Sequence, residues 1–143
     1  MRVYYIFTIK KETYETTKKN PESLYKILES IKNLKKEDAN IGFKMFDHMC
    51  SKVDKKNINK LLRDTNLDNL SYMTFNYTHT INDFLNNEST KLELYNSYIK
   101  ITSNAMYPSF FRSLFSVPYL FVCDFNNMDY FFLRNVEINS LAR

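Results

Sequence analysis

The chain has 143 residues but only one glycine, Gly42. Nucleotide sites of the Rossmann and P-loop types need several glycines, because the backbone must approach a phosphate closely. The sequence therefore excludes those sites, and its turns must use Asn, Asp, Ser and Lys instead. Tryptophan is absent too, yet Phe and Tyr make up 16% of the residues, so we expect aromatic rings to fill much of the core.

Cysteine and histidine are also scarce, with two of each. Cys50 and Cys123 make no disulfide framework, which favours a reducing, cytoplasmic setting. No Cys-x-x-Cys or His-x-x-x-His spacing occurs, so we expect no metal and no cofactor. A thiol enzyme would require Cys123 to meet His79, but Cys123 stands in an apolar run and is better explained as a small core residue.

Long apolar runs are missing as well. Residues 117–123 are too few to cross a bilayer, and residues 3–9 are not followed by a cleavage site, so we expect neither a membrane span nor a leader. Of the acidic pairs, Asp124 and Asp129 flank a predicted turn, where Asp side chains bond to the backbone. The sequence thus offers no catalytic residues, and we expect a protein that is not an enzyme.

The charge is unevenly distributed. Residues 1–63 hold 15 Lys/Arg and 8 Asp/Glu, a net +7, whereas residues 64–143 hold 5 and 8, a net −3. One interpretation is a basic face that meets a partner of opposite sign, and a small nucleic-acid-binding domain is one such function. The other is a set of solvated helix faces. No helix-turn-helix or ribonucleoprotein motif supports the nucleic-acid alternative.

The first half of the chain predicts one strand followed by three helices. Residues 2–10 are rich in β-branched and aromatic residues, which indicates a strand buried on both faces and central in its sheet. An Asn-Pro-Glu start and helical spacing predict a helix over 21–34. A second helix is predicted over 37–53, and a third begins with Asp54 as its cap. The apolar stripe of the second helix, expected to face the core, is Ala39, Phe43, Phe46, Cys50 and Val53.

The second half predicts mainly strands. Residues 73–81 alternate apolar and polar, as in a single strand. The remaining predicted elements are a hairpin of 91–95 with 98–102, a helix opening at Tyr107, and a hairpin of 119–124 with 130–134. This order predicts an α/β domain of the α+β type, with a mixed sheet of about five to six strands packed with about four helices in two layers. We expect residues 1–143 to form a single domain.

The two ends of the chain carry motifs of a known family. The opening residues 4–12 and the close of the chain, through Phe110-Phe111, residues 117–126, Tyr130 and Leu133, combine aromatic strands with an Asp-Phe-Asn turn. They resemble the sporulation inhibitor of replication family, SirA, and the hairpin 91–102 falls in the right place between them. These residues are characteristic of the family's fold and are not catalytic residues.

The resemblance implies a small α/β protein of endospore-forming bacteria. Such a protein binds the N-terminal domain of the replication initiator DnaA and stops new rounds of chromosome replication at sporulation. It would act by occlusion, covering a surface that the initiator uses for assembly. We therefore expect a cytoplasmic monomer that contacts DnaA rather than DNA or a membrane.

The resemblance also implies where the partner binds. In the family, binding involves the segment after the first strand and a nearby helix. Tyr14 corresponds to the family's aromatic contact there, and Thr17 replaces a second aromatic. On the second predicted helix, three polar residues lie off the apolar stripe and are expected to be exposed. The predicted partner-binding residues are Thr13, Tyr14, Thr17, Lys18, Lys44, Asp47 and His48.

Overall fold

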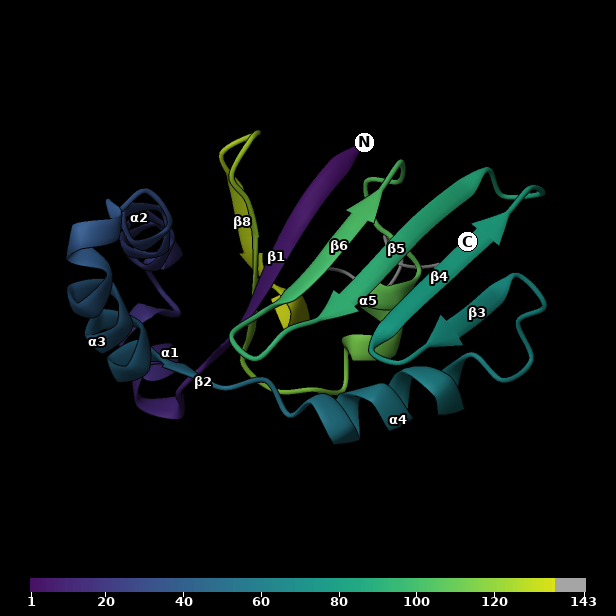
Figure 1. Cartoon of the computed structure of the whole chain (residues 1–143), viewed down its shortest axis with the longest axis horizontal. Helices are drawn as coiled ribbons and strands as arrows, with labels where there is room; N and C mark the ends of the chain where they lie inside the picture. Colours follow the sequence, from purple (N-terminus) through teal and green to yellow (C-terminus); the bar gives the residue numbers. More distant parts are fainter. Residues whose placement is uncertain (136–143) are drawn as a thin grey trace.

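The computed structural model describes residues 1–135, which are built around one antiparallel sheet (Figure 1). Within these residues eight strands pair in the order β3-β4-β5-β6-β1-β7-β8, and β2 pairs with the end of β1. The strands are β1 (Arg2–Ile9), β2 (Cys50–Ser51), β3 (Tyr72–Phe75), β4 (Thr78–Asp83), β5 (Glu88–Leu94), β6 (Ile99–Ser103), β7 (Leu120–Asp124) and β8 (Asp129–Phe132). The sheet is thus wider than the predicted five to six strands, and antiparallel throughout the described residues rather than mixed.

Strand β1 is central, as its apolar sequence predicts. It lies between β6 and β7, and its side chains alternate between two cores. Tyr4 and Ile6 belong to the first core, with Phe110 and Phe111. Phe7 and Ile9 belong to a second core on the opposite face. A strand buried on both faces needs apolar residues on both of its sides, which explains the run from Val3 to Phe7.

Helices pack against both faces of the sheet. The helical elements of residues 1–135 are α1 (Lys11–Thr17), α2 (Pro21–Lys32), η1 (Lys36–Asp38), α3 (Ala39–Met49), α4 (Lys55–Thr65), α5 (Phe110–Leu114) and η2 (Leu133–Asn135). Helices α4 and α5 bury side chains in the first core, whereas α2 buries Leu24, Tyr25 and Leu28 in the second. The predicted α+β class is confirmed, with a further helical layer over the β1–β7–β8 part of the sheet.

Residues 73–81 form a hairpin rather than the single predicted strand. The chain reverses at Asn76, whose φ of 54° is tolerated by Asn better than by most residues, and β3 pairs back onto β4. His79 and Ile81 are buried, but Met73 and Phe75 on β3 are exposed. The alternation of apolar residues continued across the turn, so sequence periodicity did not reveal it.

The second predicted helix is shorter than expected. Helix α3 ends at Met49, and Cys50 leaves it to pair with Ile9 in β2. Phe43, placed by periodicity in the inward stripe, is 66% exposed. The next helix does start as predicted, since the Asp54 carboxylate accepts a hydrogen bond from the Asn57 backbone N–H at 3.4 Å.

Candidate protein-docking surface

Helices α1 and α3 meet at the end of β1. Helix α1 starts directly after β1, and α3 ends directly before β2, which pairs with β1. The backbone N–H of Lys10 donates to the carbonyl of Met49 at 2.9 Å, and its Nζ donates to the carbonyl of Asp47 at 2.5 Å. These bonds hold the C-terminal end of α3 beside the N-terminal end of α1.

The predicted partner-binding residues are divided between these two helices. Lys44, Asp47 and His48 are exposed on α3, as predicted. On α1, the Thr17 hydroxyl donates to the carbonyl of Thr13 at 2.6 Å, and Lys18 pairs with Glu15 at 2.8 Å. The junction therefore brings the start of α1 near Asp47, whereas Lys18 follows the far end of α1. We call the seven predicted partner-binding residues, together with Ile41 and Met45 described below, the α1–α3 surface.

Tyr14 is more deeply packed than a surface contact needs. Its ring centroid lies 4.9 Å from that of Tyr119 and 5.0 Å from that of Phe132, and the side chain is half-buried. Tyr119 holds a φ of 59°, an unusual value for a bulky residue, at the start of β7. Tyr14 thus fixes α1 onto the edge of the second core, and only part of its ring is left for a partner.

Because of this packing, Tyr14→Ala is expected to lower the free energy of unfolding by about 2 kcal/mol, less than a fully buried aromatic would cost. Tyr14→Phe keeps both ring contacts and should stay within about 0.5 kcal/mol of the unaltered protein. Urea denaturation followed by circular dichroism measures both. Equal stability of the alanine variant and the unaltered protein would contradict this structural role.

Sequence reasoning missed two apolar residues on α3. Ile41 is 58% exposed and Met45 is 38% exposed. They are four residues apart and share the outer face of the helix with Lys44 and His48. The signal was present, since both lie off the predicted apolar stripe on a face expected to be polar. Apolar side chains surrounded by polar ones are the usual composition of a protein interface.

The structure separates the candidate catalytic pair. His79 is fully buried, and its ring lies 6.4 Å from that of Phe110 in the first core, whereas Cys123 belongs to the second core on the other face of the sheet. Burial raises the pKa of the Cys123 thiol far above its usual range. A thiolate activated by His79 is therefore incompatible with this geometry.

His79 is instead a structural residue. Its Nε2 lies 2.6 Å from Asn59 Oδ1, which can only accept, so Nε2 carries the proton. Its Nδ1 then accepts from the Tyr72 hydroxyl at 2.7 Å. Burial, followed by the charge of Arg63, lowers the pKa of His79 to about 4. This neutral histidine joins α4, β3 and β4.

The basic residues do not form one face. Helix α2 packs on the second core and α4 on the first, so the lysines of these two helices lie on opposite sides of the sheet. The expected basic face of the first half is thus divided, because consecutive helices cross from one face to the other through β2. In residues 1–135, no three His, Cys, Asp or Glu side chains are grouped so as to hold a metal ion. No helix in that range is long and apolar enough to span a membrane.

A comparison with known protein families finds a match. The family model described as "Sporulation inhibitor of replication protein SirA" matches residues 2–137, which is nearly the whole chain. A comparison with curated proteins finds no match. The matched range includes every strand of the sheet and both helices of the α1–α3 surface. The chain therefore belongs to the SirA family of sporulation inhibitors of replication.

Proposed function

We propose that this protein binds the N-terminal domain of the replication initiator DnaA through the α1–α3 surface and so inhibits initiation of chromosome replication during sporulation. Membership of the SirA family supports a role in inhibiting replication at sporulation. The observation that carries the surface is the exposure of Ile41 and Met45 on α3. An 11-residue helix that buries only Gly42 and Met49 has most of its side chains available to a partner.

The inhibition proposed is steric, with no bond made or broken. Exposed methionine adapts to a partner surface because it is unbranched and flexible. Lys44, Asp47 and His48 provide a polar rim around the apolar centre, and such a rim orients the partner more than it adds affinity. Once docked, the domain would cover a surface that DnaA needs for assembly at the origin.

Calorimetric titration of the full chain with the isolated N-terminal domain of DnaA tests the proposal. We expect saturable binding with a Kd of about 1 μM or tighter, typical of a specific interface of standard size. Absence of binding at about 100 μM, with both proteins folded by circular dichroism, would contradict it.

A cellular measurement tests inhibition separately from binding. Expression during vegetative growth of a spore-forming host should lower the ratio of origin to terminus DNA, because new rounds of replication are not started. If the protein binds DnaA but this ratio does not change, the proposed partner is supported and the proposed inhibition is contradicted.

A further inference from the structure

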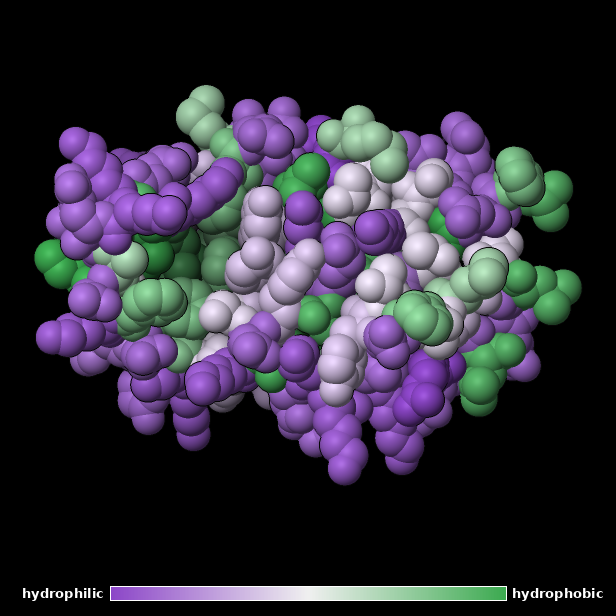
Figure 2. All heavy atoms as spheres, in the orientation of Figure 1, coloured by the Kyte–Doolittle hydropathy of each residue, from purple (hydrophilic) through white to green (hydrophobic). Residues whose placement is uncertain are grey.

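An open groove separates the helical layer from the sheet. Its volume is about 510 Å³, and it appears in Figure 2 as a hydrophobic hollow between the helices at the left and the strands. The sheet contributes an aromatic wall of Tyr5, Phe7, Tyr98 and Phe125. Pockets for small molecules have volumes of roughly 300 to 1,000 Å³ and mainly apolar walls with a few polar groups.

The helical wall of the groove is apolar too. It is formed by Ile31, Leu34, Phe43 and Phe46. Helix α3 approaches the end of α2 at Gly42, where a Cβ would lie 2.8 Å from Leu34 Cδ1 and 3.7 Å from Ile31 Cγ2. The two helices therefore pack against each other at Gly42. The next residue, Phe43, lies at the open side of the groove.

The rings of the aromatic wall contact one another. The ring of Tyr5 lies 5.3 Å from that of Tyr98 and 5.7 Å from that of Phe125, while Phe7 and Phe46 are 6.1 Å apart across the groove. Rings that already contact one another lose little conformational entropy when a ligand binds, so the site is preorganised for an apolar body.

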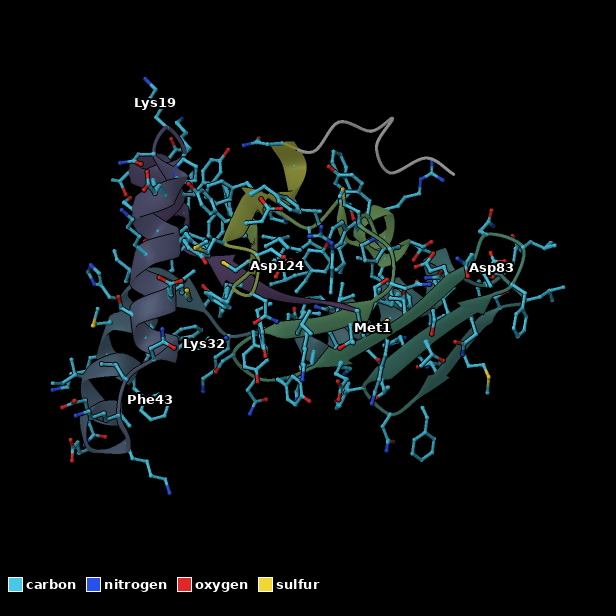
Figure 3. The ribbon with its side chains drawn as sticks, turned by 90° about the horizontal axis from the view of Figure 1, so that it is seen from above. Met1, Lys19, Lys32, Phe43, Asp83 and Asp124 are labelled. Atoms are coloured by element: carbon cyan, nitrogen blue, oxygen red, sulfur yellow. The ribbon has the colours of Figure 1, made fainter. Side chains whose placement is uncertain are left out.

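Every charged side chain that lines the groove among the described residues is a lysine. Lys32, Lys35 and Lys36 stand on its helical rim, and Glu37 and Asp38, which follow on η1, do not line it. Lys32 Nζ lies 4.6 Å from the ring centroid of Phe125 and 5.6 Å from that of Tyr5. Figure 3 labels Lys32 and Phe43 on the helical layer that bounds the groove. The groove thus combines lysine ammonium groups on its rim with apolar walls.

We infer that the groove binds an anionic amphiphile, whose apolar chain lies along the aromatic wall and whose head meets the lysine rim. Charge complementarity favours this occupant, because the three exposed ammonium groups attract an anionic head, give a neutral one no such attraction and repel a cationic one. Carboxylate and phosphate heads share the chemistry, since lysine binds both as a point charge.

Titrations with laurate, dodecyl phosphate and dodecanol, each below its critical micelle concentration, test the inference on the full chain. Changes in tyrosine fluorescence or in ¹H–¹⁵N spectra report binding. We expect one saturable site for both anions and at least about fivefold weaker binding of dodecanol. The ratio of the two anion affinities distinguishes a carboxylate from a phosphate head.

Matched variants locate the site. Lys32→Gln with Lys35→Gln and Lys36→Gln should weaken anion binding about tenfold, and Phe43→Ser should weaken binding of all three compounds. Lys26→Gln is the control, because Lys26 lies on the same helix but pairs with Glu22 at 3.0 Å and does not line the groove. Circular dichroism confirms that each variant is folded.

Four results would overturn the inference. The first is the absence of saturable binding of either anion, and the second is equal affinity for dodecanol and laurate. The third is an equal effect of Lys26→Gln and the triple variant on anion binding. The fourth is a loss of DnaA binding in the groove variants without any effect on amphiphile binding, which would assign the groove to a protein partner.

Discussion

Met45→Glu is expected to weaken binding to the N-terminal domain of DnaA by about thirtyfold or more, the loss typical of removing an interface anchor. Met45 is partly exposed on the outer face of α3, one turn from Ile41 and beside Lys44. A carboxylate at this position would have to be desolvated under the partner, whereas in the free protein it stays in water. Calorimetric titration measures the affinity.

The fold should tolerate this substitution. Glutamate forms helices about as well as methionine, so we expect the free energy of unfolding to change by less than about 0.5 kcal/mol. Met73→Glu is the matched control, because Met73 is 69% exposed on β3, the edge strand at the far end of the sheet from α1, α2 and α3 (Figure 1). If both variants weaken DnaA binding equally, or if Met45→Glu does not weaken it, α3 is not part of the interface.

Acidification should destabilise the protein through His79. Its pKa is about 4 in the folded protein and near 6.5 in the unfolded chain, so between these values only the unfolded chain binds the proton. Stability from this group is complete above pH 6.5 and is lost as the pH falls toward 4. The expected loss between pH 7 and pH 5 is about 2 kcal/mol from this residue alone.

Urea denaturation at pH 7 and pH 5 measures this dependence. His79→Gln should be less stable than the unaltered protein at pH 7, because Tyr72 and Asn59 lose well-placed partners, but its stability should fall by about 2 kcal/mol less on acidification. His48→Gln removes an exposed histidine and serves as the control. Parallel pH dependence of His79→Gln and the unaltered protein would contradict the assignment of a neutral, buried ring.

Local signals predicted the parts of the fold that depend on local chemistry. The apolar and aromatic residues of β1 indicated a strand with cores on both sides, and Asp54 indicated the start of α4. Cys123 was better explained as a small core residue than as a catalytic thiol, and its burial in the second core confirms this. In each case the deciding signal was a residue type within its own segment of the sequence.

Other features depended on tertiary context and were not predictable. Periodicity shows which residues share a face, but not whether that face finds a partner, so Phe43 was expected in the core and lines an open groove instead. The hairpin at Asn76 was missed because its apolar alternation runs through the turn. The packing of Tyr14, expected only as a partner contact, was not foreseen either, since its contacts with Tyr119 and Phe132 come from more than 100 residues away in the sequence.

Nuclear magnetic resonance mapping tests the proposed docking surface most directly. The ¹⁵N-labelled chain would be titrated with the unlabelled N-terminal domain of DnaA, and the amide shifts followed to saturation. The account predicts that the largest changes cluster on α1 and the outer face of α3, with the β3–β4 hairpin unaffected. Changes confined to α4 or to that hairpin, or no changes at saturating concentrations, would contradict it.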